Sequence, residues 1–172
     1  MPLTALLEKL YARRRFGIRP GVDRVSRLLS NLGNPEKQFR SIHVVGTNGK
    51  GSTSAFLSSI LKRSGYRAAQ FSSPHLVRFN ERFRIDGVEC PTDRIAVNLE
   101  AVLDAAPDEA TFFEITTALA ALVFSGENVE IAVIEAGMGG CSDATAAICG
   151  EMTIITPIAL DHAEYLGTTL PE

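Results

Sequence analysis

The amino-acid sequence predicts an α/β fold in which a mostly parallel sheet carries helices on both faces. Short apolar segments alternate with segments of helical periodicity, a pattern typical of consecutive β–α–β units. Residues 130–137 are apolar and β-branched, as is usual for a strand in the middle of such a sheet. A glycine-rich turn at 46–51 joins a strand directly to a helix, which is the layout of a P-loop-containing sheet.

The elements of the first half follow from the spacing of apolar residues and from turn signals. Helical patterns cover residues 2–14 and 22–32, and the polar stretch NLGNPEKQF (31–39) is a loop. A buried strand at 41–46 precedes a helix at 50–64, which ends at Gly65. The apolar face of this helix is formed by Phe56, Leu57, Ile60 and Leu61.

The second half continues the alternation. A strand at 67–72 leads into a loop at 73–81 with a proline near its start, and 82–87 is expected to be a short exposed strand. Helices at 92–105 and 113–124 precede the strand at 130–137, and the segment 152–160 repeats the pattern of that strand. Ligands of such sheets bind beyond the carboxyl ends of the strands, so functional residues are expected there.

Composition limits the classes of function. With 172 residues, of which 45% are hydrophobic, the chain can bury the core of one domain. The net charge of −3 is too small to indicate a nucleic-acid or membrane partner. No run approaches the roughly 20 apolar residues of a membrane span, and the N-terminus lacks the order of a signal peptide. The 3 cysteines show no C-x-x-C spacing, which favours a reducing cytoplasm over a zinc site or disulfides.

The turn after the first strand has the features of a phosphate-binding loop. Gly46, Gly49 and Gly51 allow backbone N–H groups to approach an anion, and the following helix adds the positive end of its dipole. Lys50 would reach the β- and γ-phosphates of a nucleotide, and Ser52 or Thr53 can add a hydroxyl. The strict P-loop pattern is not met, because Val44 stands where its first glycine should be. The alternative is an ordinary glycine-rich turn.

Later strand ends supply further polar groups. Glu135 closes the strand IAVIE and can coordinate Mg²⁺, or it can instead cap a helix or pair with an arginine. Asp161 and His162 follow the next apolar segment and are expected at the same edge, although either can have a structural role. His43 lies inside a strand and is assigned no role.

The loop that follows the second strand is polar, and long polar loops often carry function. His75 shares this loop with Ser73, Arg78, Glu81 and Arg82, and its role stays open.

Six segments together resemble one enzyme family. They are FGIRPGVDRV (16–25), HVVGTNGKGSTSAFL (43–57), FSSPHLVRFNERFRIDG (71–87), TFFEITTALA (111–120), IEAGMGGCSDAT (134–145) and ITPIALDHAEYLG (155–167). In this order they resemble the folylpolyglutamate synthase/dihydrofolate synthase family, within the Mur ligase superfamily, along essentially the whole chain. The glycine–lysine loop alone indicates only the superfamily. The segments SSPHLVRFNER and TFFE make the resemblance specific.

The resemblance implies a set of site residues. The family's ATP loop falls on Thr47, Asn48, Gly49, Lys50, Gly51 and Ser52. Its magnesium ligands fall on Ser73, Glu135 and His162, with Lys50, Glu135 and His162 as the catalytic group. Its pterin-side contacts fall on Ile18, Arg19, Pro20, Thr111, Phe112, Phe113, Glu114, Ser142, Asp143 and Ala144. The pair Phe112 and Phe113 fits a flat ring, but helix core is the alternative. We expect the three metal-ligand positions to converge near Lys50, and the Lys50 ammonium to face solvent when no nucleotide is bound.

The implied reaction is the ATP- and Mg²⁺-dependent formation of an amide. The carboxylate of dihydropteroate, or of a reduced folate such as tetrahydrofolate, becomes an acyl phosphate that the amino group of L-glutamate then attacks. No nucleic-acid or membrane partner is implied, and the location is cytoplasmic. Full-length family members are usually monomeric, whereas an exposed apolar face on a shorter chain would favour self-association.

The chain departs from the family pattern at two places. Where GGRLDATN is usual, it has GGCSDATA, so that Cys141, Ser142 and Ala146 replace Arg, Leu and Asn. Family members are also much longer. Residues 1–172 are therefore expected to be the N-terminal ATP-binding domain, the Mur-ligase-like ATPase domain, without the C-terminal glutamate ligase domain, and to be inactive alone.

Two other functions stay open at this point. One is a Mur-type ligase acting on a peptidoglycan precursor, which shares the loop and the strand-end Glu135. The other is a non-catalytic nucleotide-binding module. SSPHLVRFNER and TFFE argue against the first, and Lys50, Ser73, Glu135 and His162 argue for descent from an active enzyme.

Overall fold

The computed structural model describes residues 1–17, 19–148 and 150–169. Its sheet has 6 strands in the order β4-β3-β2-β5-β1-β6. The strands are β1 (Arg40–Val45), β2 (Ala68–Phe71), β3 (Phe83–Ile85), β4 (Val88–Glu89), β5 (Ile131–Glu135) and β6 (Met152–Ile155). The predicted strands thus occur. Those predicted at 67–72, 82–87, 130–137 and 152–160 are shorter in the structure than expected.

Four of the strands run parallel. β5 lies between β2 and β1, and β6 pairs with the other side of β1. β3 and β4 form an antiparallel hairpin beside β2. All of β5 is buried, as its continuous apolar sequence predicted. The carboxyl ends of β1, β2, β5 and β6 therefore lie along one edge of the sheet.

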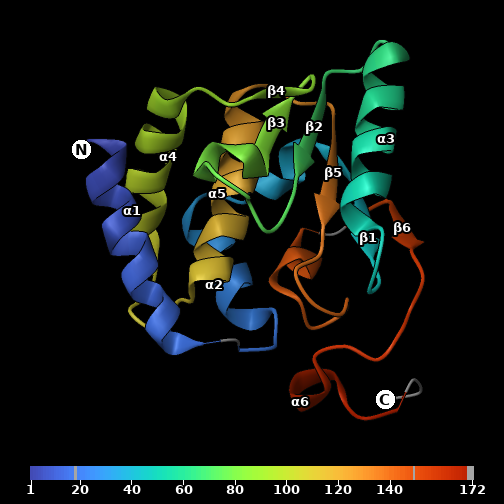
Figure 1. Cartoon of the computed structure of the whole chain (residues 1–172). Coiled ribbons are helices and arrows are strands. Elements are labelled where there is room, and N and C mark those ends of the chain that lie inside the picture. Colours follow the sequence, from blue (N-terminus) through green and yellow to red (C-terminus); the bar gives the residue numbers. More distant parts are fainter. Residues whose placement is uncertain (18, 149, 170–172) are drawn as a thin grey trace.

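Helices cover both faces of the sheet, which confirms the predicted fold class. The helices are α1 (Leu3–Ala12), α2 (Asp23–Asn31), α3 (Lys50–Arg63), α4 (Thr92–Ala105), α5 (Phe112–Gly126) and α6 (Ala163–Leu166). Short 3-10 turns occupy Arg13–Phe16, Pro35–Gln38, Phe79–Arg82 and Ala144–Ala147. Figure 1 shows α3 on one side of the sheet and α1, α2, α4 and α5 on the other. No helix among the described residues is long and apolar enough to cross a membrane.

The main core lies between the sheet and α5. Ile115 and Leu119 of α5 are fully buried in one cluster with Phe71 of β2 and Ile134 of β5. Because side chains alternate along a strand, Ile131, Val133 and Glu135 lie on the opposite face, toward α3. The alternation places Glu135 on the same side of the sheet as the helix that begins with Lys50.

α3 meets the sheet through serines and not through its predicted apolar face. Ser54 and Ser58 are its buried residues, whereas Phe56 is 70% exposed and Ile60 is 59% exposed. Leu57 and Leu61 are partly buried. Small side chains let the helix lie close to the flat apolar surface of β5, so hydrophobic periodicity alone gave the wrong contact face.

Two strand expectations also need correction. The segment 82–87 is not an exposed strand, because Phe83 is completely buried and packs on Phe71, with ring centroids 5.8 Å apart. The segment 152–160 forms a strand only as far as Ile155 and lies at the edge of the described sheet. Met152 and Ile155 are 56% and 66% exposed there, so this strand is unlike the buried β5.

The serine contact of α3 can be tested by two substitutions at one position. The Ser54 hydroxyl is buried without a partner among the described atoms, so Ser54→Ala should leave the free energy of unfolding unchanged or raise it by up to about 1 kcal/mol. Ser54→Leu overpacks the contact and should lower it by about 1–3 kcal/mol. Denaturant unfolding measures both. Ser59→Leu, on the exposed side of α3, is the control and should change the value by less than about 0.5 kcal/mol.

Candidate functional site

The loop between β1 and α3 is held by the segment that follows β6. The Thr47 backbone N–H donates to the Pro157 carbonyl at 3.0 Å, and the Thr47 hydroxyl donates to the Ala159 carbonyl at 3.0 Å. A Cβ on Gly46 would lie 2.3 Å from the Thr156 hydroxyl oxygen, so only glycine fits at that position. Gly49, with φ of 83°, immediately precedes α3. The loop is therefore fixed by contacts within the protein before any ligand arrives.

Lys50 is the first residue of α3, and its ammonium is partly buried. Nζ donates to the Gly46 carbonyl at 2.7 Å and to the Thr47 carbonyl at 3.1 Å. The expectation of a solvent-facing ammonium is therefore wrong. The charge instead closes the loop on itself, because the loop carbonyls are the nearest acceptors.

Glu135 ends β5 beside this loop. The residue is 6% exposed, and its carboxylate accepts the Ser73 backbone N–H at 3.3 Å. A Cβ on Gly51 would lie 3.5 Å from the carboxylate, so Glu135 faces the first turn of α3. Burial raises the pKa of Glu135, while the Ser73 N–H, Lys50 and Arg82 act in the opposite direction. The structure thus brings a partly desolvated carboxylate, Ser73 and the loop lysine to one place.

His162 follows the edge strand β6 and precedes α6. Its side chain is 47% exposed, and its backbone N–H donates to Asp161 at 2.8 Å. His162 lines the same cavity as Ser73. Within the described part of the chain, no three His, Cys, Asp or Glu residues are grouped so as to hold a metal ion. Convergence of His162 on Glu135 stays a prediction.

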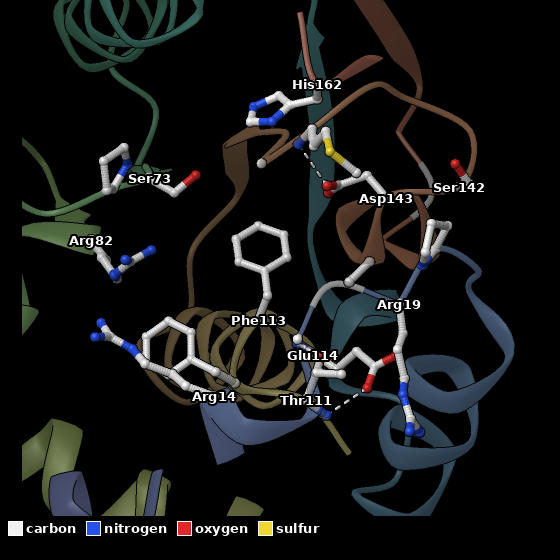
Figure 2. A pocket seen from close by; sticks show the side chains of 17 residues that line it. Arg14, Arg19, Ser73, Arg82, Thr111, Phe113, Glu114, Ser142, Asp143 and His162 are labelled. Carbon is white, nitrogen blue, oxygen red and sulfur yellow. Dashed lines mark hydrogen bonds between the residues drawn. The ribbon is translucent and has the colours of Figure 1, made fainter. Parts of the chain in front are cut away.

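One cavity of about 420 Å³ gathers most of the predicted acceptor residues. Figure 2 shows their side chains around it. Those that line it are Arg19, Pro20, Thr111, Phe112, Phe113, Glu114, Ser142, Asp143 and Ala144, together with Ser73 and His162. Ile18, which was also predicted, lies outside the described residues.

The aromatic pair forms one wall of the cavity and also contacts the core. Phe112 stacks on Tyr11, with ring centroids 5.7 Å apart and planes at 12°. Phe113 lies 6.2 Å from the Phe71 ring, and it fills the space that a side chain on Gly137 would need. Both phenylalanines are partly buried and line the cavity. The two phenylalanines can therefore pack against the core and also contact the ring of a ligand.

Glu114 is buried at 2% exposure, and it fixes the start of α5. It accepts the Thr111 N–H at 2.8 Å, and the Thr111 hydroxyl accepts the Glu114 N–H at 3.2 Å, which is a reciprocal capping box. Arg24 pairs with the other carboxylate oxygen at 2.7 Å and also donates to the Arg19 carbonyl at 2.7 Å. The polar atoms of Thr111 and Glu114 are thus engaged in holding this wall together.

Asp143 is held in place by hydrogen bonds that no local sequence pattern indicates. Its carboxylate accepts the Met138 N–H at 2.9 Å and both the N–H and the hydroxyl of Thr145. The same hydroxyl lies 2.8 Å from Nε2 of His43, which is buried in β1. Burial lowers the pKa of His43, and the nearby Asp143 opposes this effect. His43, assigned no role from sequence, therefore supports a residue of the cavity.

Some residues of the loop after β2 maintain its conformation, and others line the cavity. Glu81 accepts the backbone N–H groups of Leu76, Val77 and Arg78, which shapes the loop, and these bonds lower its pKa. Arg78 pairs with Glu89 at 3.0 Å on the surface.

Arg82 instead is 4% exposed and lines the cavity, and Arg14, from the turn after α1, lines it too. Burial lowers the pKa of Arg82 to about 10, so it stays charged at neutral pH. Arg82 was expected in this loop without a role, and Arg14 was not predicted because no motif marks it.

Comparison with known proteins gives consistent matches. Residues 44–170 match the Mur ligase middle domain family. The dihydrofolate synthase/folylpolyglutamate synthase of Bacillus subtilis is 38% identical over 171 residues, which cover 95% of this chain and 40% of that protein.

Two solved structures show the same fold. Escherichia coli FolC in complex with DHPP and ADP has a TM-score of 0.89 at 36% identity, covering 95% of this chain and 41% of that one. The bifunctional folylpolyglutamate synthase/dihydrofolate synthase of Yersinia pestis with AMPPNP and a Mn ion has a TM-score of 0.87 at 35% identity, covering 97% and 41%. The chain therefore spans about 40% of the length of the relatives it matches.

The buried histidine of β1 predicts a pH dependence of stability. Its pKa in the folded chain lies below the ordinary value of 6.5, so the unfolded chain binds the proton more readily. This contribution to stability is present above about pH 6.5 and is lost as the pH falls through the lower folded-state pKa. Relative to His43→Gln, the parent should therefore lose free energy of unfolding as the pH falls below about 6.5. Denaturant titrations of both proteins across this range measure the difference, and parallel curves would contradict it.

Proposed function

Because the chain belongs to the Mur ligase family, and matches folylpolyglutamate and dihydrofolate synthases along nearly its whole length, we propose that it is the nucleotide- and acceptor-binding part of an ATP-dependent amide ligase. The acceptor is dihydropteroate or a reduced folate, and the amino acid that is joined to it is L-glutamate. One observation carries the proposal: the cavity of predicted acceptor residues reaches Ser73, whose backbone bonds to Glu135 beside the phosphate loop.

The nucleotide step is assigned to the loop from Thr47 to Ser52. The loop begins a helix of 14 residues, and the N-terminus of a helix attracts phosphate through its free N–H groups and its dipole. Lys50 would exchange the Gly46 and Thr47 carbonyls for phosphate oxygens, which are stronger acceptors. The related E. coli and Y. pestis structures contain ADP and AMPPNP, which supports this assignment.

The residues at the end of β5 fit a hard divalent cation. Mg²⁺ prefers oxygen ligands and commonly uses one or two carboxylates together with substrate phosphates. Glu135 offers a buried carboxylate whose charge is costly without a cation, and Ser73 offers a hydroxyl beside it. His162 is a third candidate, although imidazole is uncommon for Mg²⁺. When bound, the cation would offset the negative charge of the phosphates during transfer.

The chemistry is a two-step acyl transfer. The acceptor carboxylate attacks the γ-phosphorus, and the bond to the β-phosphate oxygen breaks, giving an acyl phosphate and ADP. The amino group of glutamate then attacks the acyl carbon, inorganic phosphate leaves, and the nitrogen loses a proton. The task of this chain is to hold the carboxylate and the γ-phosphate in line and to stabilise the charge with Lys50.

The acceptor site favours a folate over a peptidoglycan precursor. Phe113 lines the cavity with an aromatic ring, which suits a pterin or a benzoate ring, whereas the Phe112 ring already stacks on Tyr11 and has Arg14 and Arg82 over it. Ser142 lines the cavity at a position where the family usually has leucine, so ring preference can differ from that of the relatives. Calorimetric titration with dihydropteroate and with a UDP-sugar tests the choice, and binding of the UDP-sugar alone would favour the peptidoglycan ligase.

Lys50 provides the sharpest test of nucleotide binding. Lys50→Ala should abolish measurable ATP binding in calorimetry, because the loop loses its only cation while the fold keeps its core. Lys62→Ala is a matched control at the other end of α3, where Nζ bonds to the Asp86 carbonyl 2.7 Å away. The control should bind ATP as the parent does. Equal affinity of parent and Lys50→Ala would disprove the phosphate-loop assignment.

The 172-residue chain should bind nucleotide but should not form dihydrofolate. We place the glutamate-binding residues in the part of the relatives that this chain does not span. Without them the glutamate nitrogen is not positioned, and positioning contributes about 7–11 kcal/mol to such reactions. An assay with ATP, Mg²⁺, dihydropteroate and glutamate measures the product. Turnover comparable to that of a full-length relative assayed in parallel would show that these 172 residues suffice.

A further inference from the structure

We propose that Arg82 receives the carboxylate of the acceptor substrate, and that His75 holds the Arg82 guanidinium in the orientation that this contact needs. The inference rests on the proposed function and assigns a task to the cationic side of the cavity. It names Arg82 as a substrate-orienting residue and His75 as its positioning residue.

The Arg82 guanidinium is firmly held but lacks one partner. Its Nε donates to Nδ1 of His75 at 2.7 Å, and its Cζ lies 5.5 Å from the centroid of the Phe112 ring. Its Nη1 is buried and has no hydrogen-bond partner among the described residues. A buried charged donor without an acceptor is costly, so such groups are normally paired. An acceptor atom supplied by a ligand would complete this set of contacts.

The charges around the cavity indicate which chemical group of a ligand would supply this acceptor atom. Arg14 lies over the same Phe112 ring, 4.9 Å from its centroid, so two cations share one side of the cavity. Neither forms an ion pair with a carboxylate of the described chain. Figure 2 shows both arginines on one side of Phe113, with Glu114 and Asp143 on the other. The cavity thus has a cationic side that is open to an anion. The other side carries Asp143 and Glu114 together with Arg19, and Glu114 is already paired with Arg24.

A pterin–benzoate acceptor matches this arrangement when its carboxylate faces Arg82 and Arg14. The pterin carries N–H groups at one end, and the benzoate carries a carboxylate at the other. The carboxylate therefore points toward Arg82, and the pterin points toward Asp143. A guanidinium N–H to a carboxylate oxygen is a strong, directional hydrogen bond.

The location of Arg82 agrees with the chemistry. Ser73 and Pro74 line the cavity with Arg82, and the Ser73 N–H bonds to Glu135 beside the phosphate loop. Glu135 and Arg82 are also close enough to influence each other's pKa. A carboxylate held by Arg82 would therefore lie at the side of the cavity nearest the proposed γ-phosphate site.

His75 is held by the loop in a position that allows this contact. Its Nδ1 accepts the Arg82 N–H, so in the neutral ring the proton is on Nε2. Its ring packs edge-on against Phe79, with centroids 5.8 Å apart. The neighbouring backbone N–H groups of Leu76, Val77 and Arg78 all bond to Glu81, which fixes the position of the histidine.

The test compares two ligands that differ only in the carboxylate. Calorimetry measures binding of dihydropteroate and of its counterpart with an unsubstituted phenyl ring. The parent should prefer dihydropteroate by about 10–100-fold, the range expected for one hydrogen bond to a charged group. Arg82→Gln should lose this preference and still bind the phenyl analogue as the parent does, which also shows that the variant is folded. His75→Ala should lose part of the preference. Arg84→Gln, at a partly exposed arginine two residues away that pairs with Glu89, is the control and should keep it.

The outcomes separate the two proposals. If the parent binds neither ligand, the proposed function is wrong, and this inference fails with it. If the parent binds both ligands equally, or if Arg82→Gln weakens both equally, Arg82 does not receive the carboxylate and the proposed function stands. If Arg82→Gln does not fold, His75→Ala decides, and an unchanged preference in that variant overturns the inference.

Discussion

The parallel pairing of β2, β5, β1 and β6 is the constraint on which the candidate site depends. Each of these strands enters the sheet from the same side, so each leaves it at the same edge. The phosphate loop follows β1, Ser73 follows β2, Glu135 ends β5 and His162 follows β6. Residues up to 115 positions apart in the sequence (47 to 162) are thereby brought to one edge of the sheet. β5, which ends at Glu135, is buried along its whole length between β2 and β1.

The cavity wall combines groups that are already satisfied with one that is not. The carboxylates of Glu114 and Asp143 accept hydrogen bonds from the protein, and they hold a helix start and a loop in place. Glu81 does the same for the loop after β2. Arg82 differs, because one of its donors is buried without an acceptor among the described residues. This asymmetry leaves the side of the cavity that carries Arg82 with capacity for a ligand.

The sequence allowed prediction of the elements and of the edge where the site lies, because both follow from local periodicity and parallel topology. The helix at 92–105 has the predicted bounds, and Glu135 lies beside the phosphate loop. The contact face of α3 was mispredicted, because periodicity locates an apolar stripe but does not say that Ser54 and Ser58 fit closer to the sheet. The contact of His43 with Thr145 joins residues 102 positions apart, and no local pattern encodes it. The missing partner of Arg82 likewise becomes visible only when its surroundings are known.

Gly46 and Gly51 lie in or beside the phosphate loop for different physical reasons. This difference affects how related sequences should be interpreted. Gly46 is required by the neighbouring Thr156, which leaves no room for a side chain whether or not a nucleotide binds. Gly51 has an ordinary helical backbone and room for a methyl group, so nothing in the protein itself demands it. A paralogue that had lost ATP binding would therefore keep Gly46 under selection for folding, while Gly51 would be free to drift. In a survey of such sequences, retention of Gly51 together with Lys50 would identify active descendants, and retention of Gly46 would not.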